Sequence, residues 1–197
     1  TMKKLLPILL FALLSGCASV VKLEGEQVVQ QRLSVKLSDA WNKVTIPGVS
    51  QPYEAWTQEG LPLDELRMWA GVKPGQSLVS KPSANLPKGH TAPRLPTFAA
   101  GMQADQLVSL FETMYAMDGS MVTVDKVSPA PFANQNGLRF EFSVVRKGDD
   151  LRQRGVGWVA VHKDQLFAAA FVAPKLSFFE RLLPKAERVV ASAAIKG

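Results

Sequence analysis

Four apolar-rich segments follow one another in the C-terminal half of the chain with only short turns between them. They cover residues 121–127, 137–146, 152–162 and 165–173. Short connections between consecutive strands require antiparallel neighbours. The segments therefore predict a four-stranded antiparallel meander, and the nearly continuous apolar runs of the last two place them at the sheet centre.

The N-terminal half predicts further strands. Residues 33–37 alternate apolar and polar side chains, which is the period of a half-buried strand. Ser38-Asp39 then offers an N-cap to a short helical turn over 40–44. Segments 53–59 and 63–72, with a Gly-Leu-Pro turn between them, predict a hairpin.

Two helical regions and one long loop complete the predicted elements. Residues 73–100 are rich in proline and predict an exposed loop insertion. One apolar stripe after it predicts a helix that ends near Gly119. The stripe consists of Leu107, Leu110, Phe111, Met114 and Tyr115. Segments 177–183 and 185–195 predict a bent pair of helices, with Pro184 in the first turn of the second.

These elements predict an α+β fold. We expect an antiparallel sheet of about six or seven strands, a helix after the proline-rich loop, and a C-terminal helix packed on the sheet. A hydrophobic content of 47% is enough to fill one core of ordinary size. Residues 32–197 are therefore expected to form a single domain that includes the 73–100 insertion.

The N-terminus has the layout of a secretory signal peptide over residues 1–16, with Lys3 and Lys4 before an apolar run that is too short to span a bilayer. Leu14-Ser15-Gly16-Cys17 resembles the bacterial lipobox, in which the cysteine receives diacylglycerol. The resemblance implies cleavage before Cys17 and lipidation of its thiol. An internal disulfide is excluded because Cys17 is the only cysteine of the chain. The alternative is an ordinary or buried thiol.

The first residues of the mature chain indicate the membrane to which it is sorted. Ala18 is not the aspartate that favours inner-membrane retention in this class of lipoprotein, so the resemblance implies the outer membrane, facing the periplasm. Residues 17–31 are polar and are expected to be a tether. Removal of Lys3 and Lys4 lowers the net charge from +6 to +4. Export argues against nucleic acid as a partner, and we expect a mild attraction to anionic lipid headgroups or lipopolysaccharide.

The mature sequence resembles the PsbP and DcrB type of small extracytoplasmic protein over about residues 32–195. The resemblance rests on the strand at 32–37, the four-strand meander, and the ending Phe167-Ala168-Ala169-Ala170-Phe171 followed by Phe178-Phe179-Glu180 and Leu183-Pro184. It implies a largely non-enzymatic assembly or accessory protein, and DcrB-like members are themselves envelope lipoproteins. The 73–100 insertion departs from the compact pattern.

No motif predicts catalysis, a metal or another cofactor. His90 and His162 are the only histidines and lie far apart, whereas a zinc site needs three or four clustered ligands. Ser120, His162 and Asp164 form an imaginable hydrolase triad, but no nucleophile elbow surrounds the serine. The adjacent acids Asp64 with Glu65 and Asp149 with Asp150 are interpreted as solvated turn acids rather than a glycosidase pair.

Two groups of residues remain as candidate binding features. Trp56 and Trp69 would line a groove for a sugar, peptide or lipid, or they would complete the core. Four basic residues bracket one hairpin turn and would form a docking patch for an acidic partner, or they would be a solvated surface hairpin. The basic residues are Arg146, Lys147, Arg152 and Arg154.

Three functions are consistent with these features. The first is a non-catalytic cell-envelope lipoprotein that binds or supports another envelope component, with an envelope protein as partner and a lipid anchor in the membrane. The second is a carrier or sensor of a small hydrophobic or sugar ligand. The third is a periplasmic hydrolase.

Replacement of Cys17 by alanine is expected to move the chain from the membrane pellet to the soluble fraction, because the thiol that accepts the lipid is lost. Ser15→Ala, which keeps a small residue before the cysteine, should leave membrane fractionation unchanged. Cell fractionation and immunoblotting measure both. A Cys17→Ala chain that stays wholly in the membrane pellet would contradict the anchor.

Overall fold

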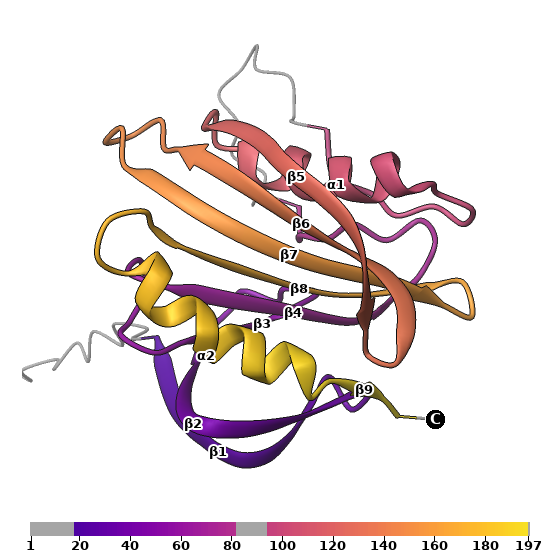
Figure 1. Cartoon of the computed structure of the whole chain (residues 1–197), viewed down its shortest axis with the longest axis horizontal. Coiled ribbons are helices and arrows are strands. Elements are labelled where there is room, and N and C mark those ends of the chain that lie inside the picture. Colours follow the sequence, from indigo (N-terminus) through magenta and orange to yellow (C-terminus); the bar gives the residue numbers. More distant parts are fainter. Residues whose placement is uncertain (1–17, 82–93, 197) are drawn as a thin grey trace, which may run out of the picture.

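A computed structural model describes residues 18–81 and 94–196, which form a nine-stranded antiparallel sheet with one helix on each face (Figure 1). The strands are β1 (Ser19–Val29), β2 (Leu33–Thr45), β3 (Glu54–Thr57), β4 (Glu65–Val72), β5 (Met121–Phe132), β6 (Gln135–Val145), β7 (Arg152–His162), β8 (Gln165–Pro174) and β9 (Ala194–Ile195), and the helices are α1 (Ala104–Ala116) and α2 (Phe179–Ala191). The predicted α+β class is confirmed.

The strand order is β1-β2-β3-β4-β8-β7-β6-β5, with β9 beside the start of β2. The last four strands of this order run sequentially from β8 back to β5, so the predicted meander is confirmed. β8 is central, and all but its first residue are buried. Because side chains alternate along a strand, Phe167 and Phe171 contribute to the core under α2, while Leu166 and Val172 contribute to the core under α1.

The structure differs from the prediction at the N-terminus. The tether expected over 17–31 is a strand from Ser19 on, and β1 pairs with β2 from Ser19↔Thr45 to Val29↔Leu33. Most of its side chains are exposed, which explains the missing apolar periodicity: the backbone ladder holds this edge strand. The helical turn predicted over 40–44 belongs to β2, because Asn42 to Val44 pair with β3. The folded body therefore starts at Ser19 rather than at residue 32.

The C-terminus also differs from the prediction. Residues 179–191 form one helix, α2, which includes Pro184, where a bent pair of helices was expected. The proline removes one backbone hydrogen bond, but the buried face of the helix offsets that loss by packing on the sheet. This face consists of Phe179, Leu182, Ala186, Val189 and Val190.

Residues 73–81 and 94–100 are the described parts of the 73–100 insertion. They pack on the face of the sheet that α1 covers. Ser77 and Thr97 form an isolated bridge, and Leu78 and Phe98 are fully buried beside α1. The indole N–H of Trp69 donates to the Leu78 carbonyl at 2.8 Å. Two apolar residues of the predicted loop are thus core residues. His90 lies outside the described residues.

Two phenylalanines on β6 lie over two glycines on β7. Phe140 is directly opposite Gly157, and Phe142 is opposite Gly155. A Cβ atom added at either glycine would run into the ring of its opposite phenylalanine. Both phenylalanines are buried in the core under α1. The glycines therefore provide the space in which the rings lie flat on the sheet.

We expect Gly157→Ala to lower the free energy of unfolding by about 1–3 kcal/mol, because the new methyl group displaces a ring in a packed core. Gly148→Ala is the matched control, since an added Cβ there meets nothing within 4 Å; its effect should stay within about 0.5 kcal/mol. Urea denaturation measures both. Equal stability of the two variants would contradict the packing described here.

Candidate functional site

The two tryptophans predicted to line a groove do not form one. Trp56 is 1% exposed and Trp69 is fully buried. They also lie on opposite faces of the sheet, Trp56 in the core under α2 and Trp69 in the core under α1. The groove prediction is therefore wrong. Trp56 lies opposite Leu66 and shares its face, whereas Trp69, three residues farther along β4, points to the other face.

The four basic residues of the predicted patch do not form a continuous surface. Arg146 pairs with Asp149 at 2.5 Å, and the Lys147 side chain packs beside Gly119 after α1. Arg154 instead faces α2, where it pairs with Glu180 at 2.6 Å and lies over the Phe179 ring. Arg152 lies two residues before Arg154 on β7. The patch is thus divided between the two faces of the sheet.

The residues of the imagined triad lie apart. The Ser120 hydroxyl accepts a hydrogen bond from the Lys147 N–H in the β6–β7 turn. His162 lies at the opposite end of the 11-residue strand β7, next to Asp164 in the β7–β8 turn. That separation is about 33 Å, far beyond hydrogen-bond reach. These three residues do not form a catalytic unit.

Within residues 18–81 and 94–196, no three histidine, cysteine, aspartate or glutamate side chains are grouped so as to hold a metal ion. The helices in the same ranges are all too short or too polar to cross a bilayer.

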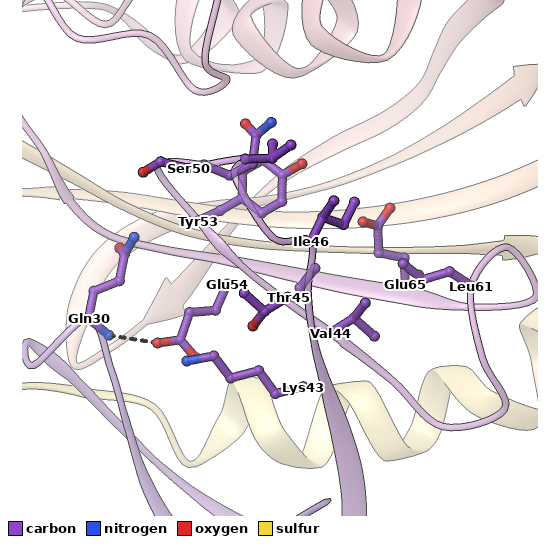
Figure 2. Close-up of a pocket in the computed structure, with 13 residues that line it drawn as sticks. Gln30, Lys43, Val44, Thr45, Ile46, Ser50, Tyr53, Glu54, Leu61 and Glu65 are labelled. Carbon is purple, nitrogen blue, oxygen red and sulfur yellow. Dashed lines mark hydrogen bonds and ion pairs between the residues drawn. The ribbon is translucent and has the colours of Figure 1, made fainter. Parts of the chain in front are cut away.

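Two adjoining hollows surround Tyr53, on the segment that joins β2 to β3. Two cavities of about 370 and 380 Å³ share Ile46, Tyr53, Leu61 and Glu65 as lining residues. We call the first the Lys43 hollow, the second the Arg67 hollow, and the two together the Tyr53 cleft. Figure 2 shows the Lys43 hollow, with Tyr53 and Ile46 on one side and the Lys43–Glu54 pair on another.

Fixed polar groups line the Lys43 hollow. Lys43 Nζ pairs with Glu54 Oε2 at 2.9 Å, and the Gln30 backbone N–H donates to Glu54 Oε1 at 3.2 Å. The indole N–H of Trp56 also donates to Glu54 Oε2 at 3.1 Å. Glu54 is therefore held by three donors from three different segments. The hollow presents ordered charge beside the apolar Ile46 and Leu61.

A guanidinium lies between two phenols in the Arg67 hollow. Arg67 Cζ is 4.8 Å from the centre of the Tyr53 ring and 5.4 Å from that of Tyr115. Arg67 Nη2 pairs with Glu65 Oε2 at 2.9 Å. The Arg67 Nε and the Tyr115 hydroxyl are shielded from solvent and have no hydrogen-bond partner among the described residues. Unpaired buried donors of this kind are costly and are commonly satisfied by water or a ligand.

The ionisation of this cluster follows from its burial. Burial raises the pKa of both phenols, Tyr53 and Tyr115, above the ordinary value, although the charge of Arg67 opposes the rise. Burial alone would lower the pKa of Arg67, but the Glu65 carboxylate and the two tyrosines raise it more strongly, and the net shift is upward. The cluster therefore holds one permanent cation, one carboxylate and two neutral phenols.

The loop between β3 and β4, which borders the cleft, is organised by a buried carboxylate. Asp64 is 1% exposed and accepts hydrogen bonds from the Thr57 hydroxyl at 2.8 Å and from the backbone N–H groups of Gln58 at 2.6 Å and Glu59 at 2.8 Å. The interpretation of Asp64 as a solvated turn acid is wrong. Its three donors fix the loop that carries Leu61 and Leu63.

Sequence reasoning missed the Tyr53 cleft, but two signals pointed to it. Arg67 lies between Glu65 and Trp69 on one face of a predicted strand, so that face combines a cation with a large apolar side chain. The chain also has only two tyrosines, and both contact Arg67. Their meeting depends on long-range packing of α1 on β4, which no local pattern shows.

The chain as a whole has the fold of a solved structure. The solution structure of the cyanobacterial PsbP protein CyanoP from Synechocystis sp. PCC 6803 is similar, with a TM-score of 0.55. It is 12% identical in sequence, and the match covers 92% of this chain and 95% of that chain. The fold is PsbP-like. No family model and no curated protein sequence matches the chain.

The two tyrosines make the cluster directly measurable, because they are the only phenols of the chain. In the folded protein, tyrosinate absorbance should appear only well above pH 10, the ordinary midpoint, and unfolding in urea should return the midpoint to about pH 10. Since the folded state keeps its phenol protons longer, stability should fall as the pH rises above about 10. An ordinary midpoint in the folded chain would contradict burial of the cluster.

Proposed function

We propose that the protein is a non-catalytic cell-envelope lipoprotein that binds another envelope component in the Tyr53 cleft. It is attached by lipid on Cys17 to the outer membrane and faces the periplasm. The observation that carries the proposal is the cleft itself: two adjoining hollows with an aromatic residue at their junction, apolar walls and fixed ion pairs.

The composition of the cleft supports a protein partner. Protein interfaces combine an aromatic or arginine anchor with an apolar surround and a polar rim. Tyr53 and Arg67 provide the anchor, Ile46 and Leu61 the apolar surround, and the Lys43–Glu54 pair a polar border. A segment of a partner that carries an apolar side chain and backbone carbonyls would complement this surface.

The PsbP-like fold supports a non-catalytic role, as the resemblance stated from the sequence implies. Ser120 bonds to the β6–β7 turn, whereas His162 is the last residue of β7, and this separation supports the non-catalytic role further, because a serine hydrolase would need the two within hydrogen-bond reach. The lipobox-like residues 14–17 support a location in the cell envelope.

A second candidate function is a carrier of a small ligand, and one specific observation favours it. The Arg67 Nε and the Tyr115 hydroxyl lack partners at a hollow of about 380 Å³, which lies within the size range of small-molecule sites. A ligand with a hydrogen-bond acceptor would satisfy both donors. The volume of the Arg67 hollow suits one small molecule, whereas a protein segment would extend over both hollows of the Tyr53 cleft.

A photo-crosslinking amino acid at Tyr53 tests the proposal in cells with the full chain. Replacing Tyr53, or Ile46 in the same cleft, by p-benzoylphenylalanine should give a light-dependent adduct with one envelope protein, because the partner segment lies against these positions. The adduct is detected by immunoblotting and identified by mass spectrometry.

Val161 is the matched control, since it is 37% exposed at the far end of β7. An adduct equally abundant from Val161, or none from Tyr53 and Ile46, would overturn binding at the cleft. An adduct with a small molecule other than a bilayer lipid would favour the carrier function instead.

A further inference from the structure

Five exposed large apolar side chains gather at one end of the sheet. We call them the apolar rim: Val20, Ile46, Leu61, Leu63 and Leu176, with exposed fractions of 61, 53, 41, 37 and 80%. They border two surface hollows on either side of the β3–β4 loop. One, of about 470 Å³, includes Val20, Ile46 and Leu61, and the other, of about 700 Å³, includes Leu63 and Leu176.

The rim leucines are held in place. Leu61 and Leu63 lie on the loop that the buried Asp64 carboxylate organises, and the Leu63 N–H also donates to the Gly60 carbonyl at 2.8 Å. Leu176 lies in the short link between β8 and α2, where its carbonyl accepts from the Phe178 N–H at 2.9 Å. A water-exposed apolar set on ordered backbone indicates a binding surface rather than a frayed end.

The start of the described chain lies in the rim. Ala18 and Val20 line the same hollow as Ile46 and Leu61. Ala18 directly follows Cys17 in the sequence, and β1 begins at Ser19, so the described chain starts one residue after the proposed attachment point. A lipid on Cys17 therefore enters a bilayer directly beside the rim.

The charges around the rim suit a lipid headgroup layer. Lys175 and Arg152 lie in the hollow with Leu176, and neither takes part in an ion pair among the described residues. Asp149 and Asp150 also line this hollow. Asp149 is paired with Arg146, and Asp150 reduces the local positive charge. Long basic side chains can extend to headgroups while their stems cover apolar surface.

We propose that the apolar rim docks on the bilayer that holds the lipid of Cys17. The inference rests on the proposed function for the anchor and adds the orientation of the folded body. Because Ile46 and Leu61 belong both to the rim and to the Tyr53 cleft, docking places the cleft at the membrane surface. Its partner is then a membrane component rather than one free in the periplasm. The anchor makes weak rim contacts effective by keeping the rim at the bilayer.

Single cysteines on the rim test this orientation. The lipid occupies Cys17, the only natural cysteine, so a polarity-sensitive dye reacts only with an introduced thiol. Leu176→Cys and Leu63→Cys are made in the full chain, processed in cells, labelled, and reconstituted in phosphatidylethanolamine and phosphatidylglycerol vesicles with a nitroxide-labelled lipid. Both dyes should shift to shorter emission wavelength and be quenched by the nitroxide. Val161→Cys, at the far end of β7, should show neither effect.

Vesicle flotation separates the two possible failures. A chain that does not float with the vesicles overturns the anchor and hence the proposed function. A chain that floats while its dyes at 176 and 63 emit and quench like the dye at 161 overturns the rim inference and leaves the anchor intact. Self-quenching between dyes of two copies, without quenching by the nitroxide lipid, would show a dimer surface and also overturns it.

Discussion

The structure depends on the pairing of β8 with a neighbour on each side. β8 pairs with β4 and with β7, and it thereby joins the N-terminal strands to the C-terminal meander. Neither half forms the continuous sheet without it. Because nearly all of its side chains are buried, alternately on two faces, one strand provides the base for both hydrophobic cores.

Three consecutive alanines on β8 set the shape of both faces. Directly opposite residues of an antiparallel pair share a face, and three large side chains lie opposite these alanines: Trp69 opposite Ala168, Trp158 opposite Ala169, and Arg67 opposite Ala170. The small methyl groups leave space for two indoles and a guanidinium. The Tyr53 cleft therefore has its origin in the centre of the sheet, since Ala170 gives Arg67 the room to lie between its two tyrosines.

Local patterns were sufficient for the meander, for α1 and for the α+β class, because each depends on periodicity and short turns. They failed where long-range pairing decides. β1 has few buried residues and exists through its ladder with β2, and residues 40–44 are extended because β3 pairs with them. The tryptophans are core residues on two faces, an arrangement that their spacing permitted but did not reveal. The cleft was missed because it joins β2, β4 and α1 through contacts that only the folded chain makes.

The position of β1 at the edge of the sheet has a mechanical consequence. β1 pairs only with β2, and it is the strand next to Cys17. With the proposed lipid on Cys17 held in a bilayer, tension would pass into this ladder first. A pull along the strand is shared by all of its hydrogen bonds, whereas a pull across it peels them one pair at a time from Ser19. The register shift between Leu23 and Gly25 divides the ladder into two blocks of paired residues. Peeling would break the block from Ser19 to Leu23 first and the block from Gly25 to Val29 second. The proposed attachment would thus be stiff in one direction and compliant in the other.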